Sequence, residues 1–176
     1  MDSRPLKTRL GARVLMIVDD EVLLLNDSDP GVPGSSWWVT PGGGIDAGED
    51  PAVAACREVE EETGLRLVPA DLTGPVARRR ACHGYSDRIL VQDDVFFTAR
   101  VDRFGLDTSG WTEAERRRVK AWGWFRLDSL PEDPWPRQIA DIAASDASCP
   151  LDLGQQEEST IPLTPAEWER VSAELS

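Results

Sequence analysis

The sequence predicts a mixed α/β domain, because runs with strand character alternate along it with segments that carry helix signals. Its 176 residues, 40% of them hydrophobic, are enough for one core and too few for two large domains. Seven Trp and four Phe can supply buried aromatic area. We therefore expect a domain whose stability depends on neither disulfides nor a structural metal.

The first third of the chain predicts strands followed by a glycine turn. Residues 13–18 and 22–25 are rich in β-branched residues and Leu, which indicates a hairpin. Residues 27–36 are rich in Asp, Gly, Pro and Ser, so we expect a loop there. Residues 37–39 then form a short strand that leads into a triple-glycine turn at residues 42–44.

A helix over residues 51–63 has signals at both ends. Asp50 can cap its N-terminus, and Pro51 suits the first helical position. Gly64 suits the left-handed position that ends a helix. The residues between are good helix formers.

Further elements follow in the second half. Residues 88–101 and 121–127 have strand composition, and residues 138–144 are weakly helical. Residues 148–160 are polar and rich in turn formers, so we expect a loop. The sequence from Thr164 begins like a capping box that opens a helix to about Leu175. We expect a main domain over residues 1–150, with a loop and helix over residues 151–176 packed on it.

The composition excludes several classes of function. A net charge of −13 disfavours binding to a nucleic-acid polymer but allows a small anionic substrate bridged by divalent cations. One His and three Cys without C-x-x-C spacing leave almost no ligands for zinc, so we expect reduced thiols. No run of 18 apolar residues and no apolar leader is present. These features predict a cytoplasmic protein that is not bound to a membrane.

Three glutamates share one face of the predicted helix 51–63. Glu58, Glu61 and Glu62 fall within an arc of roughly 100°, whereas Glu60 points away. Like charges at this spacing oppose the helix by about 0.2–0.5 kcal/mol per pair, and acids near a helix C-terminus meet the negative end of its dipole. A solvated acidic face is the ordinary interpretation of such a run. The glycine turn before the helix favours coordination of Mg²⁺ instead, since Mg²⁺ prefers carboxylates, water and phosphate oxygens.

Residues 43–65 resemble the Nudix box, G-x5-E-x7-R-E-U-x-E-E-x-G-U, in which U is aliphatic. Every specified position matches, from Gly43 through Glu49 to Leu65. A chance match is of order one in a billion per start position. The resemblance implies an α/β/α sandwich with a mixed β-sheet. It also implies a Mg²⁺-dependent hydrolase, with Mn²⁺ as a possible substitute, that cleaves a small nucleotide.

The resemblance assigns roles to individual residues. The metal would be bound by Glu58, Glu61, Glu62 and the backbone of Gly43, and Glu58 would be a candidate general base. The carboxylates would be oriented by Arg57.

Two acids outside this metal-binding set, Glu49 and Glu115, have other expected roles. Glu49 is expected to brace the loop. Many members of the family supply a further Glu just before the late aromatic strand, and residues 119–123 contain none. We take Glu115 as the candidate for that catalytic role. The other acids considered were Glu113, Asp93 and Asp94.

Several aromatic residues and the single histidine have two interpretations. Tyr85, Trp37 or Trp111 could stack on a base, but each is more often structural, and His83 is interpreted as structural too.

The substrate is expected to be a nucleoside diphosphate linked to another group, or a nucleoside triphosphate. The alternatives are a Nudix-like module that binds a nucleotide without cutting it, and a purely structural acidic helix. A homodimer is somewhat favoured over a monomer.

Overall fold

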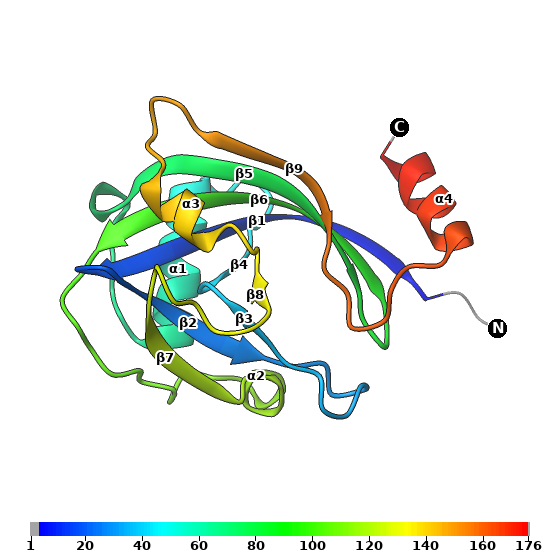
Figure 1. Ribbon diagram of the computed structural model, residues 1–176, viewed down its shortest axis with the longest axis horizontal. Helices are drawn as coiled ribbons and strands as arrows, with labels where there is room; N and C mark the ends of the chain where they lie inside the picture. The colour runs from blue at the N-terminus through cyan, green and yellow to red at the C-terminus, as the bar shows by residue number, and fades with distance from the viewer. Residues whose placement is uncertain (1–3, 176) are drawn as a thin grey trace.

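The computed structural model describes residues 4–175, which form one mixed, curled sheet with helices on both sides (Figure 1). Within these residues the strand order is β8-β3-β2-β1-β6-β5-β9, with β4 paired to β1 and β7 paired to β2. The strands are β1 Leu6–Val18, β2 Glu21–Asp27, β3 Trp37–Val39, β4 Gly42–Gly44, β5 Thr73–Gly84, β6 Ile89–Arg100, β7 Ala121–Arg126, β8 Pro134–Trp135 and β9 Leu151–Glu157. The helices are α1 Pro51–Thr63, η1 Pro69–Asp71, α2 Glu113–Arg118, α3 Ile139–Ala144 and α4 Pro165–Glu174.

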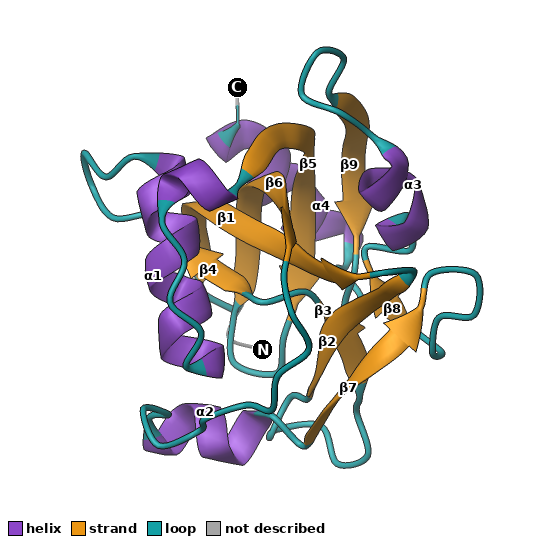
Figure 2. Ribbon diagram, turned by 90° about the vertical axis from the view of Figure 1, so that its left-hand side faces the viewer, coloured by secondary structure: helices purple, strands orange, loops and turns teal. Residues whose placement is uncertain are grey.

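The sheet is covered by α1 on one face and by α3 on the other (Figure 2). Successive residues of a strand point to opposite faces, and β1 follows this rule. Val14 and Met16 pack in the core beneath α1, whereas Leu15 and Ile17 pack with Ile139 of α3. The expected α/β/α sandwich with a mixed sheet is therefore confirmed. No helix in the described part of the chain combines the length and apolar character needed to cross a membrane.

The predicted hairpin and helix are both present. Ile17 pairs with Val22 across the β1–β2 turn. At the start of α1 the Asp50 side chain accepts hydrogen bonds from the backbone N–H groups of residues 52 and 53, at 2.8 and 3.3 Å. Gly64 ends the helix with φ of 78°, a left-handed conformation that glycine adopts without strain.

Two predictions about loops were wrong. The glycines 42–44 are not a turn but form β4, which pairs antiparallel with Gly11 to Arg13 of β1. Residues 148–160 are not a loop throughout, because β9 lies within them and pairs parallel with β5. Leu151 and Leu153 of β9 alternate with polar residues and pack on the core, as expected for a sheet edge with one solvated face.

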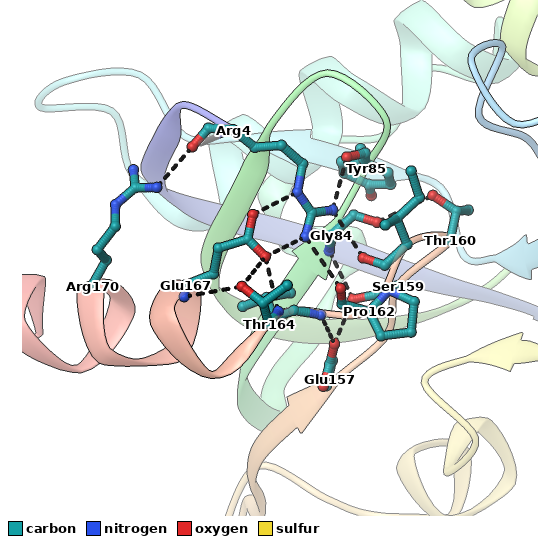
Figure 3. A network of polar contacts seen from close by, with 12 residues as sticks. Arg4, Gly84, Tyr85, Glu157, Ser159, Thr160, Pro162, Thr164, Glu167 and Arg170 are labelled. Carbon is teal, nitrogen blue, oxygen red and sulfur yellow. Dashed lines mark hydrogen bonds and ion pairs between the residues drawn. The ribbon is translucent and has the colours of Figure 1, made fainter. Parts of the chain in front are cut away.

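The C-terminal segment is attached to the sheet by a small apolar core and a cluster of polar contacts (Figure 3). Leu163 and Val171 pack on Cys82, Ile89 and Val91 of the central strands. That α4 core lies beside β5 and β6, whereas α1 packs on a different part of the sheet.

One guanidinium joins three parts of the chain here. Arg4 donates to both carboxylate oxygens of Glu167 on α4, at 2.8 and 2.7 Å. It also donates to the carbonyl of Tyr85 at 3.1 Å and to that of Ile161 at 2.9 Å (Figure 3). The start of β1, the β5–β6 turn and the segment before α4 therefore share one cation. The division of the chain at residue 150 stays a prediction.

We predict that Glu167→Ala lowers the free energy of unfolding by about 1.5–3 kcal/mol, the scale of hydrogen bonds to a charged partner. The Arg4 and Glu167 side chains are 13% and 9% exposed, so the remaining cation would be left partly desolvated. Urea denaturation measures the change, with Glu169→Ala on the exposed face of the same helix as the control. Equal stability of the two variants would contradict the role given to this ion pair.

Candidate active site

The candidate site forms where α1 packs on the glycine strand β4. The backbone N–H of Gly42 donates to the carboxylate of Glu62 at 2.9 Å. On the next residue, a Cβ added to Gly43 would overlap the carboxylate of Glu58. The absence of a side chain at Gly43 therefore lets Glu58 approach the strand closely, while Glu62 reaches the backbone of Gly42.

Arg57 holds this arrangement together through hydrogen bonds to three groups. It donates to both carboxylate oxygens of Glu49, each at 2.9 Å, and to the carbonyl of Gly44 at 3.0 Å. It also donates to Glu58 at 2.8 Å, whereas Glu61 lies 3.7 Å away and its side chain is 54% exposed. Arg57 therefore fixes Glu58 more directly than Glu61, and Glu49 braces the loop that precedes α1.

The two inner acids lie in a site that disfavours their charged forms. Desolvation raises the pKa of Glu62 to about 8, against the hydrogen bond from Gly42 and the charge of Arg13. Burial also raises the pKa of Glu58, although the hydrogen bond from Arg57 opposes this shift. Glu49 shows the opposite behaviour, since its hydrogen bonds to Arg57 lower its pKa to about 2.

The residues present fit a divalent cation. Two partly buried carboxylates with raised pKa values lie at one strand, and a cation placed between them would offset the desolvation of both. Mg²⁺ is usually held by one or two carboxylates together with water and phosphate oxygens, which matches this donor set. Among residues 4–175 no three acidic, His or Cys side chains converge in one preassembled cluster, and Glu61 lies at the exposed rim.

The other candidate acids lie elsewhere. Glu60 pairs with Arg66 at 2.7 Å on the outer face, as expected. The carboxylate of Glu115 caps its own helix, accepting from the backbone and hydroxyl of Thr112 at 2.6 and 2.7 Å, and no contact within the described chain joins it to the inner glutamates. Its catalytic role stays a prediction. The remaining acids, Glu113, Asp93 and Asp94, each pair with arginine.

A cavity of about 300 Å³ that the sequence did not predict is lined by Arg9 and Arg13, whose side chains lie beside Gly44 and Gly42 of β4. The rings of Trp37 and Trp135 stack at 4.3 Å in its wall. Tyr85 and His83 stack at 5.5 Å and also line it. Burial lowers the pKa of His83 to about 3, so the ring is neutral and its Nδ1–H donates to the carbonyl of Glu158 at 2.8 Å. These aromatic residues line one wall of the cavity, and a role in stacking on a base stays a prediction.

The fold and the arrangement of α1 on β4 define a Nudix-type domain. The NUDIX domain model matches residues 7–144, and the chain therefore belongs to the Nudix family.

The chain is also similar to individual proteins. It is 28% identical over 158 residues to an RNA pyrophosphohydrolase of Acidiphilium cryptum, covering 81% of this chain and 90% of that protein. It is 30% identical over 108 residues to the RNA pyrophosphohydrolase of Bartonella quintana, covering 53% of this chain and 59% of that protein. The chain spans less than two thirds of the length of that relative. The same holds for two further relatives, an RNA pyrophosphohydrolase of Rhizobium meliloti and a Nudix hydrolase of Bacillus subtilis.

Solved structures share the fold. The MutT NUDIX hydrolase from Burkholderia pseudomallei superposes with a TM-score of 0.53 at 28% identity, covering 76% of this chain and 95% of that one. The MutT protein from Bacillus halodurans superposes with a TM-score of 0.59 at 21% identity, covering 86% and 91%. The second similarity concerns the fold alone.

We predict that Glu62→Gln stabilises the metal-free protein in alkaline but not in acidic solution. The folded-state pKa of about 8 exceeds the ordinary glutamate pKa of 4.5, so between these values the folded protein holds a proton that the unfolded chain releases. Stability therefore falls as pH rises through this window, and glutamine removes the effect. In EDTA, the free energy of unfolding of the variant minus that of wild type should be larger at pH 9 than at pH 5, by on the order of 3 kcal/mol.

Denaturation with urea at both pH values measures this difference, and Glu60→Gln on the outer face is the matched control. A Glu62→Gln effect that is the same at pH 5 and pH 9 would show that Glu62 is not protonated in the folded protein.

Proposed function

We propose that the protein is a Mg²⁺-dependent hydrolase, with Mn²⁺ as a substitute, that cleaves a phosphoanhydride bond of a small nucleotide. The substrate is a nucleoside diphosphate linked to another group or a nucleoside triphosphate. The observation that carries the proposal is the pair of partly buried carboxylates, Glu58 and Glu62, held against β4 beside a cavity lined by arginines and aromatic rings.

The metal would be held by Glu58 and Glu62, with Glu61 and the backbone of Gly43 completing the set. When bound, Mg²⁺ neutralises phosphate oxygens and polarises the attacking water. Arg57 fixes the Glu58 carboxylate by a hydrogen bond to one of its oxygens, at 2.8 Å. Because its raised pKa makes it a stronger base than a solvated glutamate, Glu58 is our candidate general base.

The proposed reaction is an in-line attack of water on phosphorus, which yields two phosphorylated products. Relatives named RNA pyrophosphohydrolase support cleavage of a pyrophosphate bond. The net charge of −13 disfavours a polymer of phosphates, which is why we propose a small nucleotide as the substrate.

We predict that Glu62→Gln lowers Mg²⁺-dependent product release by at least about 10²-fold, the scale on which a preorganised charge-stabilising group acts. The measurement is a screen of nucleoside triphosphates, nucleotide sugars and dinucleotides with identification of both products. Glu60→Gln should keep wild-type turnover, because Glu60 faces outward and pairs with Arg66.

Unchanged turnover by folded Glu62→Gln would refute the proposed site. If the wild-type protein binds a nucleotide in calorimetry but releases no product over hours with either metal, the protein is a binding module instead.

A further inference from the structure

The C-terminal end of α1 depends on donors from outside the helix. The last carbonyls of a helix have no donor within it, and together they form the negative end of its dipole. In α1 these carbonyls lie close to acidic side chains, because Glu58, Glu61 and Glu62 all belong to the last two turns. The last turn of α1 contains no basic residue that would offset them. Donors supplied by another part of the chain therefore stabilise this helix end.

Two such donors come from the segment that precedes α2. The backbone N–H of Asp107 donates to the carbonyl of Thr63 at 3.0 Å. The indole Nε1–H of Trp111 donates to the carbonyl of Glu62 at 2.7 Å. A Cβ added to Gly64 would overlap the Cβ of Asp107, so the segment packs directly on the helix end. The indole therefore binds the backbone of one of the candidate metal ligands.

Glu62 is consequently held at both of its ends. Its carboxylate accepts from the backbone N–H of Gly42 at 2.9 Å, and its carbonyl accepts from Trp111 at 2.7 Å. The first bond ties the side chain to β4, and the second ties the backbone to the segment before α2. Since the last turn of a helix readily frays, the bond to the carbonyl keeps the carboxylate within reach of β4.

The segment that carries Trp111 is itself fixed. The backbone N–H of Trp111 donates to the carbonyl of Thr108 at 3.1 Å, and the same carbonyl accepts from Arg116 of α2 at 3.1 Å. The backbone N–H of Ser109 donates to the side chain of Asp107 at 2.9 Å. A tryptophan side chain has only two torsions, so on such a support its N–H is presented in one place.

A neutral donor suits this place better than a cation would. A lysine or arginine at the helix end would also offset the carbonyls, but it would pair with the nearby carboxylates and compete with a divalent ion for them. The indole of Trp111 is a donor only and carries no charge. It therefore satisfies the carbonyl of Glu62 and leaves the charge of the carboxylate to the metal.

We propose that Trp111 is a positioning residue of the metal site, because its N–H holds the backbone of Glu62 so that the carboxylate stays against β4. This inference rests on the proposed function, in which Glu62 binds the divalent ion. Trp111 acts through Glu62 and binds neither the ion nor the substrate. The role differs from both interpretations of Trp111 that the sequence allows, which are stacking on a base and packing alone.

The test follows the bond between Glu62 and Gly42 in EDTA, which requires neither metal nor turnover. Hydrogen exchange of the Gly42 amide, measured by NMR, reports how often that bond opens. The amide of Ile45, just after β4, is the internal reference, because it donates to the carbonyl of Leu10 at 2.9 Å and not to α1. Calorimetric titration of Mn²⁺ into the metal-free proteins is the second measurement.

Three variants separate the N–H from the ring that carries it. Trp111→Phe removes the donor and keeps an aromatic ring. Among the described residues Trp111 belongs to none of the three apolar clusters, so this change should leave the fold intact. Trp122→Phe is the matched control, because Trp122 is 39% exposed on β7. Trp111→His is the conservative variant, since its five-membered ring again carries an N–H donor.

We expect Trp111→Phe to speed exchange of the Gly42 amide by about tenfold, the scale of one hydrogen bond, and to change exchange at Ile45 by less than about twofold. Trp111→His should restore part of the protection, and Trp122→Phe should exchange like wild type. Mn²⁺ binding should be about tenfold weaker in Trp111→Phe, as is typical when a group that orients a metal ligand is lost.

Unchanged exchange at Gly42 in Trp111→Phe would overturn the proposal. Equal acceleration at Gly42 and Ile45 would overturn it too, because a general loss of stability has that effect. Wild-type affinity for Mn²⁺ in Trp111→Phe would likewise overturn it and would leave the proposed function intact. If wild type binds no Mn²⁺, faster exchange at Gly42 would support the hold of Trp111 on Glu62 and refute the proposed metal site.

Discussion

The lack of side chains on the strand 42–44 is the constraint on which the rest of the site depends. A helix that carries like-charged glutamates near its C-terminal end is disfavoured on its own. Here the helix packs so closely on β4 that Glu62 bonds the backbone of Gly42 and Glu58 fills the space a Cβ on Gly43 would need. Arg57 completes this packing by binding Glu49, Glu58 and the carbonyl of Gly44. These contacts hold the acids close together in one position despite their mutual repulsion.

Parts of this architecture whose signals are local could be predicted from the sequence. Asp50 and Gly64 mark the ends of α1 by their side-chain chemistry and backbone freedom, and both act as expected. The spacing of Glu58, Glu61 and Glu62 likewise follows from helical geometry alone. The exposure of the Glu61 side chain could not be predicted, because helical spacing does not show which parts of the chain pack against each helix position.

Features that depend on distant pairing were missed. The three glycines gave a turn signal, and only their register against β1 makes them a strand. β9 was hidden in a polar segment because one of its faces is solvated and its partner β5 lies about 70 residues earlier in the chain. The cavity lined by Arg9 and Arg13 was missed for a related reason. The parallel pairing of β1 with β6, between residues about 80 positions apart in the chain, places Gln92 opposite Arg9 and Asp94 opposite Gly11.

The central claim is that the bare backbone at Gly43 allows Glu58 and Glu62 to bind a divalent ion together. Calorimetric titration of Mn²⁺ into wild type, Gly43→Ala and Gly105→Ala tests it most directly, since a Cβ at Gly43 overlaps Glu58 whereas one at Gly105 meets nothing within 4 Å. We expect Gly43→Ala to bind Mn²⁺ at least about tenfold more weakly, a loss of about 1.4 kcal/mol, and Gly105→Ala to bind it like wild type. Equal affinity for Mn²⁺ in all three proteins, or no binding to wild type, would contradict it.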